Sequence, residues 1–225
     1  MFTASSLEGS PEHLTPCLCE LTSFSVHFEY YRTLRNILFQ NPNRDLDGYI
    51  FCMFTIPSFE REELTLIGND GKGNYIVRSI AANQQLYDLI GKETDRKNGK
   101  SLIYKLKNYF QRSEIDKVQL TISEKSISQK VALKVAEVCE KMIAETRYNI
   151  TPLKKIDGVS YVFSNAFGVC ARADFAYEDS LTGKLVSIGE SLHKYAKCKN
   201  EQSERIENDI YGKSIELINE IKGGS

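Results

Sequence analysis

The sequence predicts an α+β fold in which an antiparallel sheet, built from hairpin and meander strands, carries amphipathic helices packed on one face. Short apolar runs of strand length, separated by turn residues, predict the strands. Two longer stretches, residues 126–148 and 182–197, place apolar residues at helical spacing and predict the helices that cover the sheet. The aromatic content of 12 Tyr and 11 Phe without Trp suits aromatic pairs across neighbouring strands.

The chain has 225 residues, of which 41% are hydrophobic, so it is long enough to bury the core of one domain with elaborations. Residues 1–16 contain Gly9, Pro11 and Pro16, and we expect them to form a flexible lead-in. Residues 17–198 are expected to form a single α+β domain. Residues 199–225 are predicted to form a C-terminal helix, which is either docked on that domain or extended from it.

The first predicted element covers residues 24–31, where apolar and polar residues alternate and favour a strand with one buried face. A helix is the alternative, because apolar residues of the same region also recur at helical spacing. These residues are Leu21, Phe24, Phe28, Tyr31 and Leu34. Residues 41–45 contain Pro, Asp and two Asn and predict a turn. Residues 48–56 are largely apolar and end before Pro57, which predicts a central strand.

The clearest local pattern is a hairpin. The apolar runs 64–67 and 75–77 flank the segment 68–74, which reads Gly-Asn-Asp-Gly-Lys-Gly-Asn. Glycine and asparagine adopt the positive φ angles that a chain reversal requires. The sequence therefore predicts two antiparallel strands joined by this loop.

The middle of the chain predicts a short helix near residues 86–90 and a basic segment over residues 92–117. Apolar residues at helical spacing in the basic segment favour a surface helix with a solvated basic face, and an anion or partner patch is the alternative. A short strand is predicted at 118–122. A helix follows, with Ser126 or Ser128 as its N-cap, and its apolar face is expected to hold Val131, Ala132, Val135, Val138, Cys139, Met142 and Ile143.

The last third predicts two strands, residues 159–163 and 169–172, joined by a turn through residues 165–168. Apolar residues from Leu181 to Tyr195 then mark another helix. Glycine inside this helix, at Gly189, costs about 1 kcal/mol relative to alanine, so it indicates close packing against a neighbour. The final helix has an acidic outer face.

Charge and cysteine content limit the classes of partner. The net charge of -1 provides no general field for nucleic acid, so no nucleic-acid role is expected. Cys17 and Cys19 form the one close pair of cysteines, and their thiolates would need further ligands, such as His13 and His27, to hold a metal. Reduced cysteines are expected instead, with no metal and no cofactor.

The sequence predicts neither a signal peptide nor a membrane span. The first 14 residues lack the positive and apolar regions of a signal peptide, and no apolar run approaches the roughly 18–20 residues that span a bilayer. A cytoplasmic location and the absence of a membrane span are therefore expected. An exported form is the alternative, if a native leader peptide was removed.

Motifs for catalysis are weak. The three histidines accompany no G-x-S-x-G motif, and His193 is expected to be solvated on the outer part of its helix. His27 is expected on the polar side of the first strand. The glycine-rich segment 68–74 lies between strands and is not followed by a helix, so it does not resemble a phosphate-binding loop.

Polar residues gather around the last two strands and supply the candidate site. The residues expected to bind a ligand or partner are Arg147, Asp157, Tyr161, Arg172 and Glu178. We expect a non-catalytic protein-interaction factor of bacterial type, such as an immunity, inhibitor or accessory protein, whose partner is another protein. The alternative is a hydrolase or small-ligand binder that uses the same polar cluster.

Overall fold

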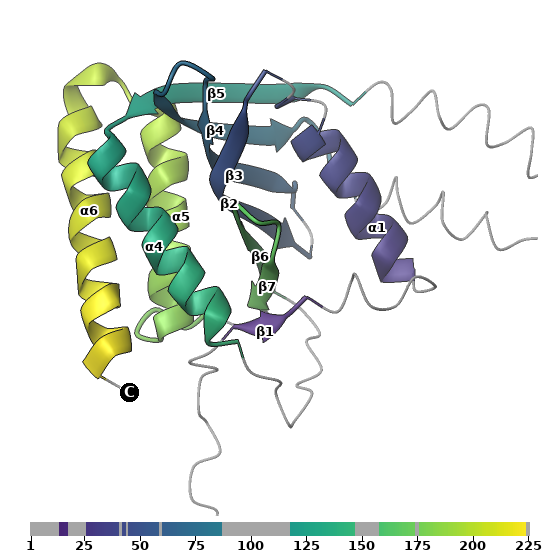
Figure 1. Ribbon diagram of the computed structural model, residues 1–225. Helices are drawn as coiled ribbons and strands as arrows, with labels where there is room; N and C mark the ends of the chain where they lie inside the picture. Colours follow the sequence, from purple (N-terminus) through teal and green to yellow (C-terminus); the bar gives the residue numbers. More distant parts are fainter. Residues whose placement is uncertain are drawn as a thin grey trace, which may run out of the picture.

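The computed structural model describes residues 14–17, 26–40, 42–43, 45–58, 60–86, 118–146, 158–173 and 176–223. Within these residues the chain forms an α+β fold in which all strand pairs of one seven-stranded sheet are antiparallel, as predicted (Figure 1). The order across the sheet is β1-β7-β6-β2-β3-β4-β5. The strands are β1 (Thr15–Pro16), β2 (Gly48–Pro57), β3 (Glu63–Asn69), β4 (Tyr75–Ala82), β5 (Leu120–Ile127), β6 (Val159–Asn165) and β7 (Cys170–Ala173).

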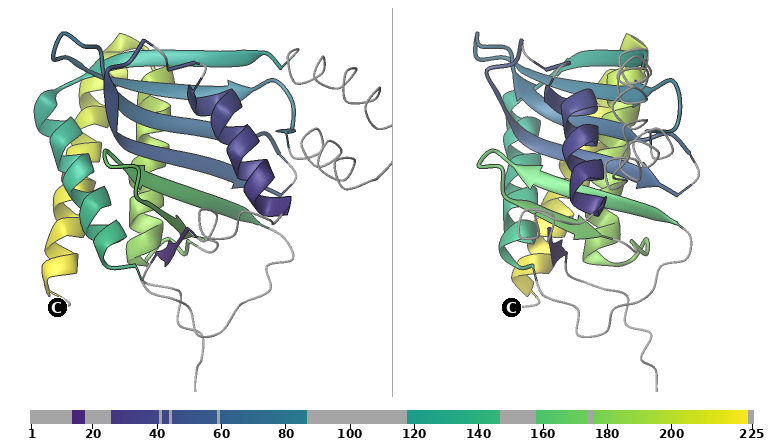
Figure 2. Two further views of the ribbon diagram at one scale, coloured as in Figure 1. Left: turned by 45° about the vertical axis from the view of Figure 1, so that its right-hand side comes forward. Right: turned by 90° about the vertical axis from the view of Figure 1, so that its right-hand side faces the viewer.

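Helices cover both faces of the sheet. One face carries α4 (Gln129–Ala144) and α5 (Leu181–Lys197), and α6 (Asn200–Gly223) packs against both of these helices. The other face carries α1 (Val26–Arg35) and the π-helical continuation η2 (Asn36–Gln40). Figure 2 shows α1 on one side of the sheet and α4, α5 and α6 on the opposite side.

The strand prediction for residues 24–31 was wrong, and the helical alternative is correct from Val26 onward. The buried residues Tyr30, Leu34, Ile37 and Leu38 follow the i, i+4, i+7, i+8 spacing of one helix face. This stripe runs beyond the eight-residue segment, residues 24–31, that suggested a strand. His27 therefore lies in a helix and not on the polar side of a strand.

The central strand and the first hairpin are confirmed. β2 occupies the middle of the sheet between β6 and β3. β3 and β4 are joined by a turn in which Gly71 and Gly73 have φ angles of 73° and 89°. The Asp70 carboxylate accepts hydrogen bonds from the backbone N–H groups of Lys72 and Asn74, at 2.8 and 3.0 Å. This turn has the positive φ angles that the sequence predicted.

β5 is longer than the strand predicted at 118–122, because it continues to Ile127 and pairs with β4 along its whole length. Its polar second half is ordinary for an edge strand. Ser128 precedes α4, so the second of the two proposed N-caps is the one observed, although its side chain makes no capping hydrogen bond. The predicted apolar face of α4 is buried at every residue named for it.

The last predicted strands and helices also form. β6 and β7 are joined through residues 166–169, and α5 and α6 follow. A Cβ atom on Gly189 would lie 2.2 Å from Met53 Sδ, so the expected close contact is with β2. The C-terminal helix is docked, because Ile210, Leu217 and Ile221 belong to the core shared by α4 and α5.

The N-terminal lead-in was predicted to reach residue 16, yet Leu14 is buried and β1 pairs with β7. The folded unit therefore includes residues 14–16. The predictions for a helix at 86–90 beyond Leu86 and for a basic helix at 92–117 lie outside the described residues.

Candidate functional site

The predicted binding residues fall into two groups. Arg147 and Asp157 lie outside the described residues, whereas Tyr161, Arg172 and Glu178 lie within them. Glu178 is exposed in the turn before α5. It lies on neither of the two strands that carry Tyr161 and Arg172.

Tyr161 and Arg172 occupy opposite faces of the sheet. Tyr161 packs against the core under the helices, and burial raises the pKa of its hydroxyl. Arg172 pairs in register with Val162, the neighbour of Tyr161, so it faces the other way. Its Nη2 atom donates a hydrogen bond to Ser160 Oγ at 3.3 Å. The described members of the predicted cluster therefore do not meet at one site.

A different polar cluster lies where the last turns of α5 cross β3 and β4. His193 Nδ1 lies 2.9 Å from Ser79 Oγ and 3.4 Å from Thr65 Oγ1. His193 Nε2 lies 2.6 Å from Lys197 Nζ and 3.5 Å from a Glu63 carboxylate oxygen. The histidine side chain is 20% exposed. The expectation of a solvated His193 was therefore wrong.

The reason lies in the position of His193 on α5. It follows Gly189 by four residues, so both belong to the helix face that rests on the sheet. Gly189 brings the helix close to β2, and His193 then reaches the hydroxyl groups of β3 and β4. The i, i+4 spacing between Gly189 and His193 is the signal in the sequence that could have predicted that His193 faces the sheet.

The contacts of His193 define its protonation. An ammonium group can only donate, so Lys197 donates to Nε2, and the neutral ring carries its proton on Nδ1. That N–H then donates to Ser79 Oγ. Burial lowers the pKa of His193, the Glu63 carboxylate opposes this, and the ammonium groups of Lys197 and Lys194 reinforce it. The structure thus favours the neutral imidazole.

A serine beside a histidine and a carboxylate invites comparison with a nucleophilic triad. Ser79 is 0% exposed, however, and Thr65 is equally enclosed. Neither hydroxyl can reach a substrate carbonyl, so the cluster joins α5 to the sheet. Within the residues that the structure describes, no group of three or more His, Cys, Asp or Glu side chains could hold a metal ion.

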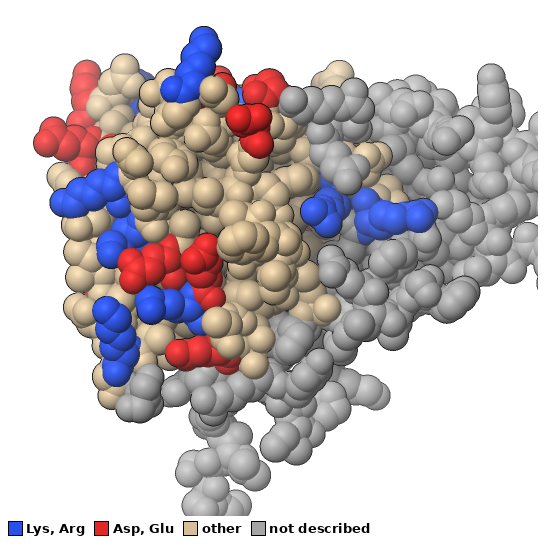
Figure 3. Space-filling model, in the orientation of Figure 1, with Lys and Arg blue, Asp and Glu red and all other residues tan. Residues whose placement is uncertain are grey.

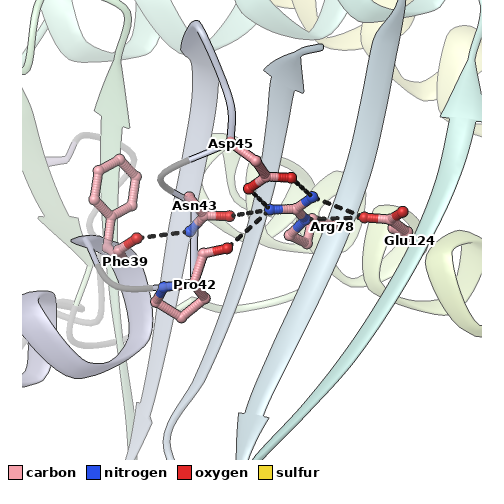
Figure 4. A network of polar contacts seen from close by, with 6 residues as sticks. All are labelled: Phe39, Pro42, Asn43, Asp45, Arg78 and Glu124. Atoms are coloured by element: carbon pink, nitrogen blue, oxygen red, sulfur yellow. Dashed lines mark hydrogen bonds and ion pairs between the residues drawn. The ribbon is translucent and has the colours of Figure 1, made fainter.

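Arg78 forms a second polar network on the opposite face of the sheet (Figure 4). The side chain is 5% exposed, and its guanidinium contacts both Asp45 carboxylate oxygens at 2.8 Å. It also donates to Glu124 of β5 at 2.8 Å and to Asn43 Oδ1 at 3.1 Å. The Pro42 carbonyl accepts a further hydrogen bond at 3.0 Å. Arg78 therefore ties the segment before β2 to the outer strand.

The electrostatics of this network are those of a structural ion pair. The hydrogen bonds from Arg78 lower the pKa of Asp45 to about 2. The Asp45 and Glu124 side chains are 63% and 54% exposed, so both carboxylates keep much of their hydration. Among the described residues, Arg78 donates side-chain hydrogen bonds to both carboxylates, and this arrangement satisfies the buried guanidinium.

An apolar surface lies at the end of the sheet where β6 turns into β7. Phe167 and Val169 in this turn are 83% and 52% exposed. The Asn165 side chain accepts hydrogen bonds from both of their backbone N–H groups at 3.1 Å. Gly168 completes the turn with a φ angle of 74°. The turn is therefore ordered by hydrogen bonds while its two apolar side chains face solvent.

A shallow hollow of about 120 Å³ is lined by residues that come from η2, the following turn, the start of β2 and the middle of β3. These residues are Phe39, Asn43, Leu46, Gly48, Tyr49 and Leu66. Tyr49 connects the hollow to the end of β6, because Ser164 Oγ lies 3.5 Å from its hydroxyl. Figure 3 shows a broad area without charged side chains between the charges over α4 and those farther to the right.

We call Phe39, Leu46, Tyr49, Phe167 and Val169 the apolar end surface. Phe167 stands in the connection predicted for residues 165–168, whereas Val169 was predicted to begin the next strand. The apolar Phe167 within a predicted turn is the signal that sequence reasoning did not use. The chain matches no protein-family model, and neither a curated protein nor a solved structure shows significant similarity to it. In the described part of the chain, no helix combines the length and apolar character needed to cross a membrane.

Proposed function

We propose that this chain is a non-catalytic protein-interaction factor that binds another protein through the apolar end surface. The observation that carries the proposal is the exposure of Phe167, an aromatic side chain that leaves 83% of its surface in water. Exposed apolar patches on soluble domains mark interaction sites, and aromatic anchors supply much of the binding free energy at such sites.

The order of the β6–β7 turn supports the same proposal. Asn165 holds the turn through its side chain and its backbone, with the Gly168 N–H donating to the Asn165 carbonyl at 3.0 Å. A side chain presented by a preorganised turn loses less conformational entropy on binding than one on a flexible loop. The order of this turn supports the proposal that Phe167 enters a pocket on a partner.

The polar clusters add support for a non-catalytic role. The hydroxyl groups beside His193 are enclosed, and the Arg78 guanidinium donates six hydrogen bonds to five acceptor atoms of the described residues. An immunity, inhibitor or accessory protein acts by stoichiometric binding and needs a complementary surface in place of a reactive group. We assign this chain to that class of proteins.

Two matched variants test the proposal. Phe167→Ser removes the exposed anchor, whereas Leu133→Ser removes an apolar side chain of α4 that is 46% exposed. Tagged wild type and both variants are used to capture proteins from the native host, and the captured proteins are quantified by mass spectrometry. We expect one partner to be retained by the wild type and Leu133→Ser and lost with Phe167→Ser. A partner retained equally by all three would contradict the proposal.

A further inference from the structure

An amine and a thiol meet where the outer strand β5 touches the end of α5. Lys125 Nζ of β5 lies 3.3 Å from Cys198 Sγ, which directly follows α5. The same ammonium donates hydrogen bonds to the Cys198 carbonyl at 2.6 Å and to Ser203 Oγ at 2.8 Å. It also lies 5.6 Å from the centre of the Tyr195 ring.

These contacts hold the two reactive atoms in place. The Cys198 thiol donates to the Tyr195 carbonyl oxygen at 3.2 Å, so the sulfur is fixed from the helix side. Lys125 is fixed by Ser203 and by the Cys198 backbone. A separation of about 3–3.5 Å between oriented groups is the geometry from which intramolecular reactions proceed readily.

Cys198 also differs from the other described cysteines in its surroundings. Cys52 and Cys139 are buried, and burial raises the pKa of Cys52 to about 12 and that of Cys139 well above its ordinary value. Such thiols remain protonated and react slowly. Cys17 is buried as well, whereas Cys170 and Cys198 are partly exposed. Of these last two, Cys198 has the lysine amine against its sulfur.

We propose that Cys198 and Lys125 form a redox-controlled covalent cross-link, an S–N bond that closes after hydrogen peroxide oxidises the thiol. In the first step the sulfur takes one oxygen atom from the peroxide, which leaves as water, and Cys198 becomes a sulfenic acid. In the second step Lys125, after losing a proton to solvent, attacks the sulfenyl sulfur with its amine lone pair.

The second step breaks the S–O bond, and the departing hydroxide takes a proton from the attacking nitrogen to leave as water. The sulfur has then been oxidised by two electrons, one peroxide has been reduced, and two water molecules have formed. Sulfenic acids condense in this way with a backbone nitrogen to give a sulfenamide. Here the side-chain amine of Lys125 is the nitrogen already in contact.

The cross-link would join the outer strand of the sheet to the junction of α5 and α6. The linked residues are 73 positions apart in the chain, so the bond restricts a long loop of the unfolded state. We expect the oxidised protein to melt several degrees higher than the reduced protein. A thiol reductant cleaves the S–N bond and restores the starting melting temperature.

The test treats the full-length chain with hydrogen peroxide and maps it by mass spectrometry without reduction. We expect a peptide pair joined through Lys125 and Cys198 whose mass is two hydrogen atoms below the sum of the separate peptides. The variants Lys125→Arg and Cys198→Ser should lack this pair. Cys170→Ser is the matched control, because among the described cysteines it removes the other partly exposed one, and it should keep the cross-link.

A second readout follows the intermediate. Dimedone traps sulfenic acids, so we expect several-fold more dimedone on Cys198 in Lys125→Arg than in the wild type. Amine acylation of Lys125 should fall in the oxidised wild type and recover after reduction. Equal dimedone capture in the two proteins, or a Lys125 amine that stays reactive after oxidation, would overturn the proposal. These readouts do not depend on the partner-binding function.

Discussion

Adding one methyl group at Gly189 tests the contact between α5 and the centre of the sheet. The Cβ atom of Gly189→Ala would lie 2.2 Å from Met53 Sδ and 2.6 Å from Met53 Cε. Met53 is buried in the core, so it must change rotamer or push α5 away. Such overpacking costs about 1–3 kcal/mol, and the helical preference of alanine over glycine returns about 0.5–1 kcal/mol. The expected net loss is roughly 1–2 kcal/mol.

Gly212→Ala is the matched control, because Gly212 lies within α6 and no atom is within 4 Å of the added Cβ. This variant should gain about 0.5–1 kcal/mol. Urea unfolding followed by circular dichroism gives both values from shifts in the midpoint at constant slope. The two variants should move in opposite directions.

A double-mutant cycle identifies the source of the loss. Met53→Val removes the sulfur and terminal methyl that the new Cβ would meet, so Gly189→Ala should cost little in that background. The coupling free energy should be about 1–2 kcal/mol. If Gly189→Ala stabilises the protein as much as Gly212→Ala does, the contact between α5 and β2 is not as described.

Three further changes have expected outcomes. Arg78→Met should lower the free energy of unfolding by about 2–3 kcal/mol, measured in urea, because Asn43 loses a buried partner while Asp45 can be hydrated. Arg78 lowers the pKa of Asp45 from 3.8 to about 2, so the stabilising contribution of Asp45 is lost as the pH falls through that range. In Arg78→Met the free energy of unfolding should therefore depend less on pH in this range. The pKa of His193 is lowered in the folded protein, so the unfolded chain binds the proton first as the pH falls below 6.5. The free energy of unfolding of the wild type should therefore fall in this range, and that of His193→Gln should fall less. Unfolding measured at stepped pH tests this.

Periodic patterns in the sequence predicted the elements in which buried residues recur at one constant spacing over many positions. α4 shows every predicted core residue buried, and the glycine turn between β3 and β4 has the positive φ angles that its sequence demands. α1 was predicted as a strand because the eight residues 24–31 fit the alternating pattern. The buried residues that extend the helical spacing, such as Leu38, lie farther along the chain.

The polar sites were harder to predict because their partners are distant in sequence. Arg78 reaches Asp45 and Glu124, which are 33 and 46 positions away, so its role depends on strand order. His193 meets Ser79 across 114 positions. The predicted cluster around Tyr161 relied on nearness in sequence, but Arg172 stands on the other face of the same pair of strands.

The most direct measurement of the proposed function is site-specific photo-crosslinking in the native host. A photoreactive amino acid replaces Phe167 in one protein and Leu133 in another, since both side chains are exposed and the second lies on α4. We predict that a single protein is cross-linked in stoichiometric amounts from position 167 and not from position 133. Equal cross-linking from both positions, or none from position 167, would contradict the claim that the apolar end surface binds a partner.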